Sequence, residues 1–193
     1  MTAPAPPCSA DQAFALMLET ACEDFENLQD LISGRLQVVA VPRDPAIPSN
    51  QDDPRKAIHA ARAPARIQMA LAKSFVFNAH RANRICEKNT AALALDRLER
   101  NRFMKATDQL AALRDVNEHG FDGGKDDVKP SMRLHSEGGW MDETSLVVLG
   151  PEKILMGAAN LYPVYLAVDR MRTLAGFNAR LPRSTPSSHR DNP

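Results

Sequence analysis

Apolar residues recur every three or four positions between residues 10 and 32, and this spacing constrains the fold more than any other feature. The apolar set comprises Phe14, Met17, Leu18, Ala21, Phe25, Leu28 and Ile32. Such spacing places the side chains on one face of an α-helix, with acidic residues between them. Ser9 and Gln12 have the spacing of a capping box, and Gly34 is a suitable C-cap. We therefore expect an amphipathic helix whose apolar face other helices must cover.

The same criterion predicts further helices downstream. A helical pattern runs from Asp53 to Asn89, where Asp-Pro supplies an N-cap and a first-turn proline, and a kink or break is expected at Pro64. Another helix is predicted from about Asp96 to His119, with an inward stripe of Phe103, Ala106, Leu110, Leu113 and Val116. A last helix is predicted from Leu161 to Gly176.

The segments between these helices have other patterns. Thr144 to Leu149 and Lys153 to Met156 flank Gly150-Pro151-Glu152, which predicts a β-hairpin. Leu146 to Leu149 is continuously apolar, so we expect burial on both faces, either against the chain's own helices or at a dimer interface. Residues 120–143 are rich in Gly and charge, which predicts an exposed loop. Residues 36–41 fit a strand or a helix tail, and a proline-rich loop follows them.

These elements predict a mainly α fold, an up-and-down bundle of four or five helices with one small β-hairpin before the last helix. At 193 residues the chain is long enough for one domain, which we place at residues 9–177. Residues 1–8 and 178–193 are expected to be disordered tails. Because a two-stranded hairpin is marginal on its own, we expect a homodimer.

Composition indicates the cellular location of the protein and the kinds of partner that it can bind. The cysteines Cys8, Cys22 and Cys86 form no CxxC pair, which argues against a disulfide framework and favours a cytoplasmic location. The longest uncharged run, Ile154 to Val168, is too short to span a bilayer, so no membrane association is expected. Metal-ligand and nucleotide-cradle motifs do not occur, so we expect no metal and no cofactor. The formal net charge is zero, so an RNA partner needs a local basic patch.

The segment Arg114-Asp115-Val116-Asn117-Glu118-His119 carries the candidate chemistry. The planar guanidinium of Arg114 is suited to a phosphate, and His119 is suited to proton transfer near neutral pH. Asp115 would orient either group, and Asn117 would hydrogen-bond a phosphate or ribose. Basic groups near a helix end also interact favourably with the helix dipole, so these residues have an alternative interpretation as a helix terminus.

A second polar cluster precedes this segment. His80 and Arg84 lie one turn apart on the preceding predicted helix. If the two helices pack side by side, this cluster would line the same groove and add positive potential for a phosphate. The alternative is an ordinary solvated helix face.

Arg114, the polar Asp115 and His119 after four intervening positions, near the end of a helix in an all-helical bundle, form a pattern that resembles the HEPN superfamily (higher eukaryotes and prokaryotes nucleotide-binding). In helix order the resemblance covers residues 72–120. It implies a homodimeric helical domain that is either a metal-independent endoribonuclease or a module that binds nucleotides or partners. In that scheme His119 exchanges a proton with the ribose 2′-hydroxyl, and Arg114 stabilises the phosphate in the transition state.

Two features depart from that family pattern. The hairpin and the Gly-rich loop are not part of the family's core. The leading hypothesis is a HEPN-like ribonuclease or an RNA- or nucleotide-binding protein. The alternative is a non-enzymatic, homodimeric helical protein that binds a protein partner.

Overall fold

A computed structural model describes residues 9–36, 54–119, 133–135 and 139–180 of the chain. The elements in chain order are α1 (Ala10–Ile32), α2 (Pro54–Lys88), α3 (Thr90–Leu93), α4 (Arg97–Thr107), α5 (Leu110–His119), β1 (Arg133–His135), β2 (Gly139–Met141), β3 (Leu146–Gly150), β4 (Lys153–Met156), β5 (Ala159–Asn160) and α6 (Leu161–Arg180). The predicted class, mainly α with a small antiparallel sheet before the last helix, is confirmed.

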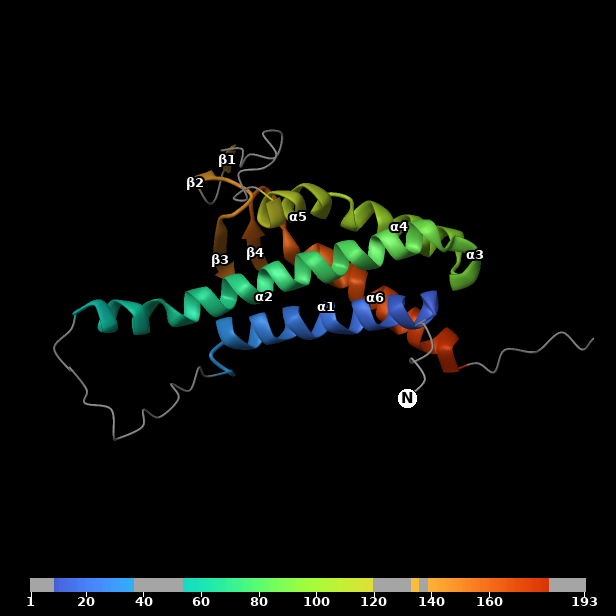
Figure 1. The fold of residues 1–193 in the computed structure, drawn as a ribbon, viewed down its shortest axis with the longest axis horizontal. Coiled ribbons are helices and arrows are strands. Elements are labelled where there is room, and N and C mark those ends of the chain that lie inside the picture. The colour runs from blue at the N-terminus through green and yellow to red at the C-terminus, as the bar shows by residue number, and fades with distance from the viewer. Residues whose placement is uncertain (1–8, 37–53, 120–132, 136–138, 181–193) are drawn as a thin grey trace, which may run out of the picture.

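The helices form a bundle around α2, the longest element. Helix α1 lies along α2, and α4 and α5 follow one another along another side of it (Figure 1). Helix α6 packs against α1 and α4 and thereby closes the bundle. The first turns of α2 extend past the end of α1 (Figure 1).

Helix α1 has the boundaries that its sequence signals predict. The Gln12 side chain accepts a hydrogen bond from the Ser9 backbone N–H at 3.1 Å. The helix ends at Ile32 with Ser33 as its C-cap, and Gly34, which was predicted as the cap, follows one residue later with φ of +71°, a left-handed conformation that glycine adopts without steric cost. The predicted apolar face is in the core, where Phe14, Leu18, Ala21, Cys22, Phe25 and Leu28 are buried.

An aromatic cluster joins the first, second and last helices. The Phe25 ring lies 5.0 Å from that of Phe75 and 4.6 Å from that of Tyr165, between ring centroids. Toward the other end of α1, Phe14 meets Phe103 of α4 edge-on at 6.0 Å. Buried aromatic rings contribute large apolar areas, so these contacts fix how the helices pack.

Helix α2 runs through Pro64, so no break occurs there, and the alternative of a kink stays a prediction. One helix prediction needs correction. The predicted helix from Asp96 to His119 is instead two helices, α4 and α5, separated at Asp108 and Gln109. The break lets α4 pack on α6 and α2 while α5 turns to follow α2. Asp96 is the N-cap of α4, and its side chain accepts from the backbone N–H groups of Leu98 and Glu99.

The predicted hairpin is confirmed as β3 and β4, and β5 extends it to three antiparallel strands. Burial of β3 on both faces is wrong for the single chain, because the Leu149 side chain is 50% exposed. The reason is that β3 is an edge strand, whereas β4 in the centre buries Ile154, Leu155 and Met156. The predicted loop at 120–143 also contains a small ladder, β1 with β2.

Several predictions fall outside the described residues, namely the N-terminal tail, the chain between residues 37 and 53, and the tail beyond residue 180. Helix α6 continues to Arg180, so residues 178–180 are helical and are not the start of a disordered tail. Within the described ranges, no helix is long and apolar enough to cross a membrane.

Candidate nucleic-acid interface

Charge is segregated between the first two helices. Helix α1 has six acidic residues and no Lys or Arg, whereas α2 has eight Lys and Arg against one acid, Glu87. These counts correspond to formal charges of −6 and +7, which nearly cancel one another. The two helices pack against one another, so attraction between them adds to their apolar contact.

The charges of α2 are concentrated on one side of the helix. Seven of the eight Lys and Arg residues, together with His59 and Phe77, recur at steps of three, four or seven residues. We call this set the basic stripe: Arg55, His59, Arg62, Arg66, Lys73, Phe77, Arg81, Arg84 and Lys88. At 100° per residue these positions fall within an arc of about 100°, and at 1.5 Å per residue they span about 50 Å. The positions of the stripe therefore lie along one side of the helix, and its described side chains are those from Arg66 to Lys88.

The basic stripe faces solvent where its side chains are described. Arg66, Arg81, Arg84 and Lys88 are exposed, and Lys73 and Phe77 are partly buried. The opposite side of α2 carries its buried residues: Ala72, Phe75, Val76, Ala79, Ala82 and Cys86. Lys73 and Lys88 form no ion pair with any residue that the structure describes. An anionic partner would thus meet cations that the fold itself does not neutralise.

An aromatic ring lies within the stripe. The Arg81 guanidinium carbon is 5.9 Å from the centre of the Phe77 ring, in a cation–π arrangement. A partly exposed ring between cations offers a stacking surface beside positive charge. Single-stranded nucleic acids are bound by this combination of groups.

Arg114, the centre of the predicted catalytic segment, lies beside the stripe on α5. Its guanidinium pairs with Asp115 at 2.9 Å and with Glu118 one turn later, and its side chain is 31% exposed. These contacts give Asp115 the predicted proximity to Arg114. They also mean that a phosphate must compete with two carboxylates for this cation.

His80 of α2 lies near Arg114, as the side-by-side packing of α2 and α5 predicts. Burial and the positive charge of Arg114 lower the pKa of His80 from its ordinary value of 6.5. A lower pKa favours the neutral imidazole, the form that accepts a proton. Among the described side chains, the fold brings His80 of α2 near two predicted site residues of α5, Arg114 and Asp115.

Asn117 is held by the backbone of two segments. Its Nδ2 donates to the Leu113 carbonyl at 2.7 Å and to the Glu143 carbonyl at 2.9 Å. The second bond ties α5 to the chain just before β3. Its Oδ1 is buried and meets no donor among the described residues. The amide is therefore fixed by two acceptors and leaves one acceptor of its own unused.

A pocket of about 240 Å³ opens between α2 and α5. Its wall is mostly apolar, and it is lined by Lys73, Ser74, Val76, Phe77, Arg114, Asn117 and the carboxylate residue Glu118. Lys73 and Phe77 belong to the basic stripe, so the pocket and the stripe adjoin. The Ser74 hydroxyl is engaged elsewhere, since it donates to Asp24 of α1 at 2.7 Å.

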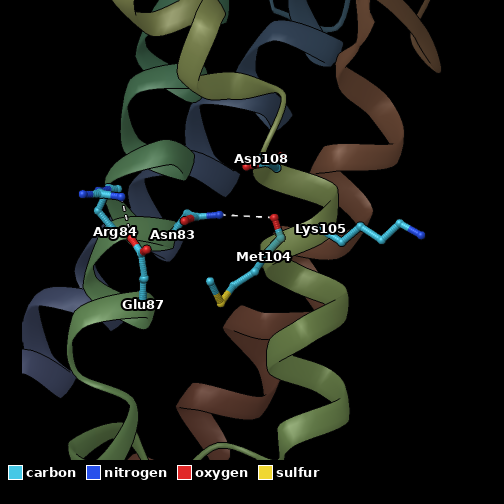
Figure 2. A pocket seen from close by; sticks show the side chains of 6 residues that line it. All are labelled: Asn83, Arg84, Glu87, Met104, Lys105 and Asp108. Atoms are coloured by element: carbon cyan, nitrogen blue, oxygen red, sulfur yellow. Dashed lines mark hydrogen bonds and ion pairs between the residues drawn. The ribbon is translucent and has the colours of Figure 1, made fainter.

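Arg84 was predicted to line one groove together with His80 and Arg114. It instead lines a second pocket, which is separate from the one between α2 and α5. It pairs with Glu87 at 2.5 Å beside a pocket of about 270 Å³ between α2 and α4. Figure 2 shows this pair at one side and Asn83 directed toward the Met104 carbonyl. Asn83 also donates to the Thr107 hydroxyl at 2.6 Å, so its amide N–H groups are already used in holding α2 to α4.

His119 is the last residue of α5, and its side chain lies outside the described residues. It lies five positions after Arg114, which places the two positions about 140° apart around the helix axis. Pairing of Arg114 with His119 in one cleft stays a prediction.

The predicted site omitted Lys73, Phe77 and Arg81. The signal was present in the sequence as the regular spacing of cations from Arg55 to Lys88. The neutral total concealed it, because the acids that balance these cations lie on other helices.

The remaining site chemistry is limited. Within the described part of the chain, no three His, Cys, Asp or Glu side chains are placed to hold a metal ion.

In comparisons with known proteins, no protein-family model, curated protein or solved structure matches this chain.

Proposed function

We propose that this protein binds single-stranded RNA along the basic stripe of α2. The observation that carries the proposal is the one-sided band of cations with Phe77 within it. Phosphate contacts by Lys and Arg supply most of the affinity of such complexes, and base stacking on aromatic rings supplies the rest. The Arg114 motif, which resembles that of an RNA-cleaving family, lies beside this face.

The shape of the surface favours a single strand over a duplex. A recognition helix must enter the major groove, which is about 12 Å wide. Beyond its first turns α2 packs against α1, α4 and α5 (Figure 1), so this part of the bundle is too wide for the groove. A flexible strand can instead follow the stripe and expose its bases to Phe77.

Fluorescence anisotropy with a 5′-fluorescein-labelled 20-nucleotide RNA of mixed sequence, in EDTA, tests the proposal. If four phosphates are neutralised, the slope for a single strand is about −0.7 per contact, and affinity falls roughly fiftyfold between 50 and 200 mM salt. A duplex DNA of the same length should bind more weakly.

Matched variants identify the surface. Lys73→Gln with Arg81→Gln removes two cations of the stripe and should lower the salt slope by about 1.4. Arg97→Gln removes one exposed cation of α4 that is not a member of the stripe, and should leave binding unchanged. Equal losses in both proteins, or wild-type binding that does not respond to salt, would contradict the proposal. Equal binding to poly-glutamate would instead identify a general anion-binding face.

Cleavage of the bound strand is a second candidate, favoured by the placement of His80 of α2 within the electrostatic reach of Arg114 of α5. A proton acceptor and a phosphate-binding cation are the groups needed for metal-independent cleavage at the 2′-hydroxyl. The RNA recovered from the binding samples should then be shortened, with cyclic-phosphate ends, by wild type and not by His80→Ala or His119→Ala. Intact RNA in every sample would leave binding as the function.

A further inference from the structure

Strand β3 has one side of its backbone unpaired among the described strands. The sheet order is β3-β4-β5, so β3 pairs on one side only, and Figure 1 shows it on the outer side of β4. The Gly157 N–H donates to the Ser145 carbonyl at 3.1 Å, which makes these two residues a hydrogen-bonded pair. Because such pairs alternate along an antiparallel ladder, Leu146 and Val148 direct their N–H and C=O groups to the open side.

The edge of β3 carries neither a charge nor a proline. Exposed edges of soluble proteins are usually protected by a lysine, a proline or a β-bulge. Residues 146–150 are Leu-Val-Val-Leu-Gly. The irregularity in the register of β3 with β4 lies between Val148 and Gly150, so it leaves residues 146–148 as regular strand. This segment is therefore able to accept another strand.

The side chains of β3 also need more cover than one copy of the chain supplies. Leu146 and Val148 pack against the hydrophobic core. Val147 is partly exposed, and Leu149 is 50% exposed. A continuously apolar strand is typical of burial on both faces, and the fold covers only one of them.

A second copy of the chain fits this edge. An antiparallel copy of β3 presents the same open N–H and C=O groups, and pairing around a two-fold axis satisfies both edges at once. The strand has no charge, so placing it against itself opposes no like charges. A nucleic acid would instead require cations, which β3 lacks. We infer that two copies pair antiparallel through β3, with Val147 opposite the partner's Val147.

A two-fold axis at Val147 uses all the open groups of the regular segment. Leu146 then lies opposite the partner's Val148, and each such pair exchanges two hydrogen bonds. The two Val147 residues form the intervening non-hydrogen-bonded pair, in which Cα atoms lie about 4.5 Å apart. A strand this short buries less than the roughly 1,200 Å² of a standard interface, so the dimer should dissociate on dilution.

Charge substitutions at Val147 test the pairing in the full chain. In sedimentation velocity, wild type should pass from monomer to dimer between about 2 and 200 µM. Val147→Lys and Val147→Glu should each stay monomeric, because like charges meet across the axis, and an equimolar mixture of the two should restore the dimer. Recovery in the mixture requires both variants to be folded. Leu98→Lys changes a side chain of α4 that is 57% exposed, and it should dimerise as wild type does.

Disulfide crosslinking tests the register. In a Cys8→Ser background, Val147→Cys should form a covalent dimer with copper phenanthroline, since about 4.5 Å between Cα atoms is within the range that a disulfide spans. Leu149→Cys is the control, because this register places its two copies roughly 14 Å apart. Cys22 and Cys86 are buried, so they should not contribute.

Four results would overturn the inference. They are wild type that stays monomeric throughout the concentration range, a Lys and Glu mixture that does not dimerise, equal crosslinking at positions 147 and 149, and a dimer that dissociates as salt is raised. The last result would identify attraction between the acidic α1 of one copy and the basic α2 of the other, because salt screens such charges and leaves backbone pairing in place. The inference does not depend on RNA binding.

Discussion

Gly157, in the turn between β4 and β5, is the position among the described glycines where one added methyl group should lower the stability most. Its φ is +55°, and a Cβ there would lie 3.1 Å from both the Glu143 Cα and the Leu113 Cδ2. The left-handed conformation costs a residue with a Cβ roughly 1–2 kcal/mol. Since the Glu143 contact is backbone, the sheet must also shift, at roughly 1–3 kcal/mol for overpacking.

Gly157→Ala should therefore lose about 2–5 kcal/mol of the free energy of unfolding. With a urea m-value of about 2 kcal/mol per M, the urea concentration at the midpoint of unfolding, followed by circular dichroism, should fall by about 1–2.5 M. Gly176→Ala in α6 is the control, because a Cβ there meets nothing within 4 Å. That variant should gain about 0.5–1 kcal/mol from higher helix propensity. A Gly157→Ala midpoint equal to that of wild type would refute the close packing of this turn on α5.

Three further outcomes test other parts of the structure. Thr107→Val should lose about 1–3 kcal/mol in thermal unfolding, because Asn83 Nδ2 then keeps only its 3.3 Å bond to the Met104 carbonyl. Cys22 should resist iodoacetamide at pH 8 in the native protein and react in urea, as mass spectrometry of its peptide would reveal, because burial raises the pKa of its thiol to about 12. Hydrogen bonds from Thr144 and Ser145 lower the pKa of Asp142 below its ordinary 3.8. The stability from Asp142 is then complete above about pH 5 and is lost as pH falls through the lowered pKa, so the stability gap between wild type and Asp142→Asn should shrink at pH 3.

Local signals in the sequence were sufficient for the helices that begin and end at strong caps. Ser9 and Gln12 begin α1 as predicted, and Gly34 follows its C-cap by one residue, since capping depends on groups within a few residues of one another. The break at Asp108 was not predictable in the same way, because no Gly or Pro marks it. It follows from α4 and α5 packing on different neighbours, and that information is tertiary.

In the candidate site too, contacts between residues close in sequence were predictable, whereas contacts between distant segments were not. The pairing of Arg114 with Glu118 follows from their four-residue spacing, so it was accessible from the sequence. The link from Asn117 to Glu143 joins residues 26 positions apart, and helical spacing cannot reveal it. The approach of His80 to Arg114 was predicted conditionally, and the packing of α2 on α5 supplies that condition.

The opposite charges of α1 and α2 give a neutral protein a large electric dipole across its width. At about 0.1 M salt the Debye length is near 10 Å, so the field of each helix reaches beyond its own surface before it is screened. A polyanion that diffuses toward the molecule would turn it until α2 leads and α1 trails, and encounters would begin in the productive orientation. A second copy would be turned the other way, with its acidic helix toward the first copy's basic stripe, so nucleic acid and self-association would compete for one face.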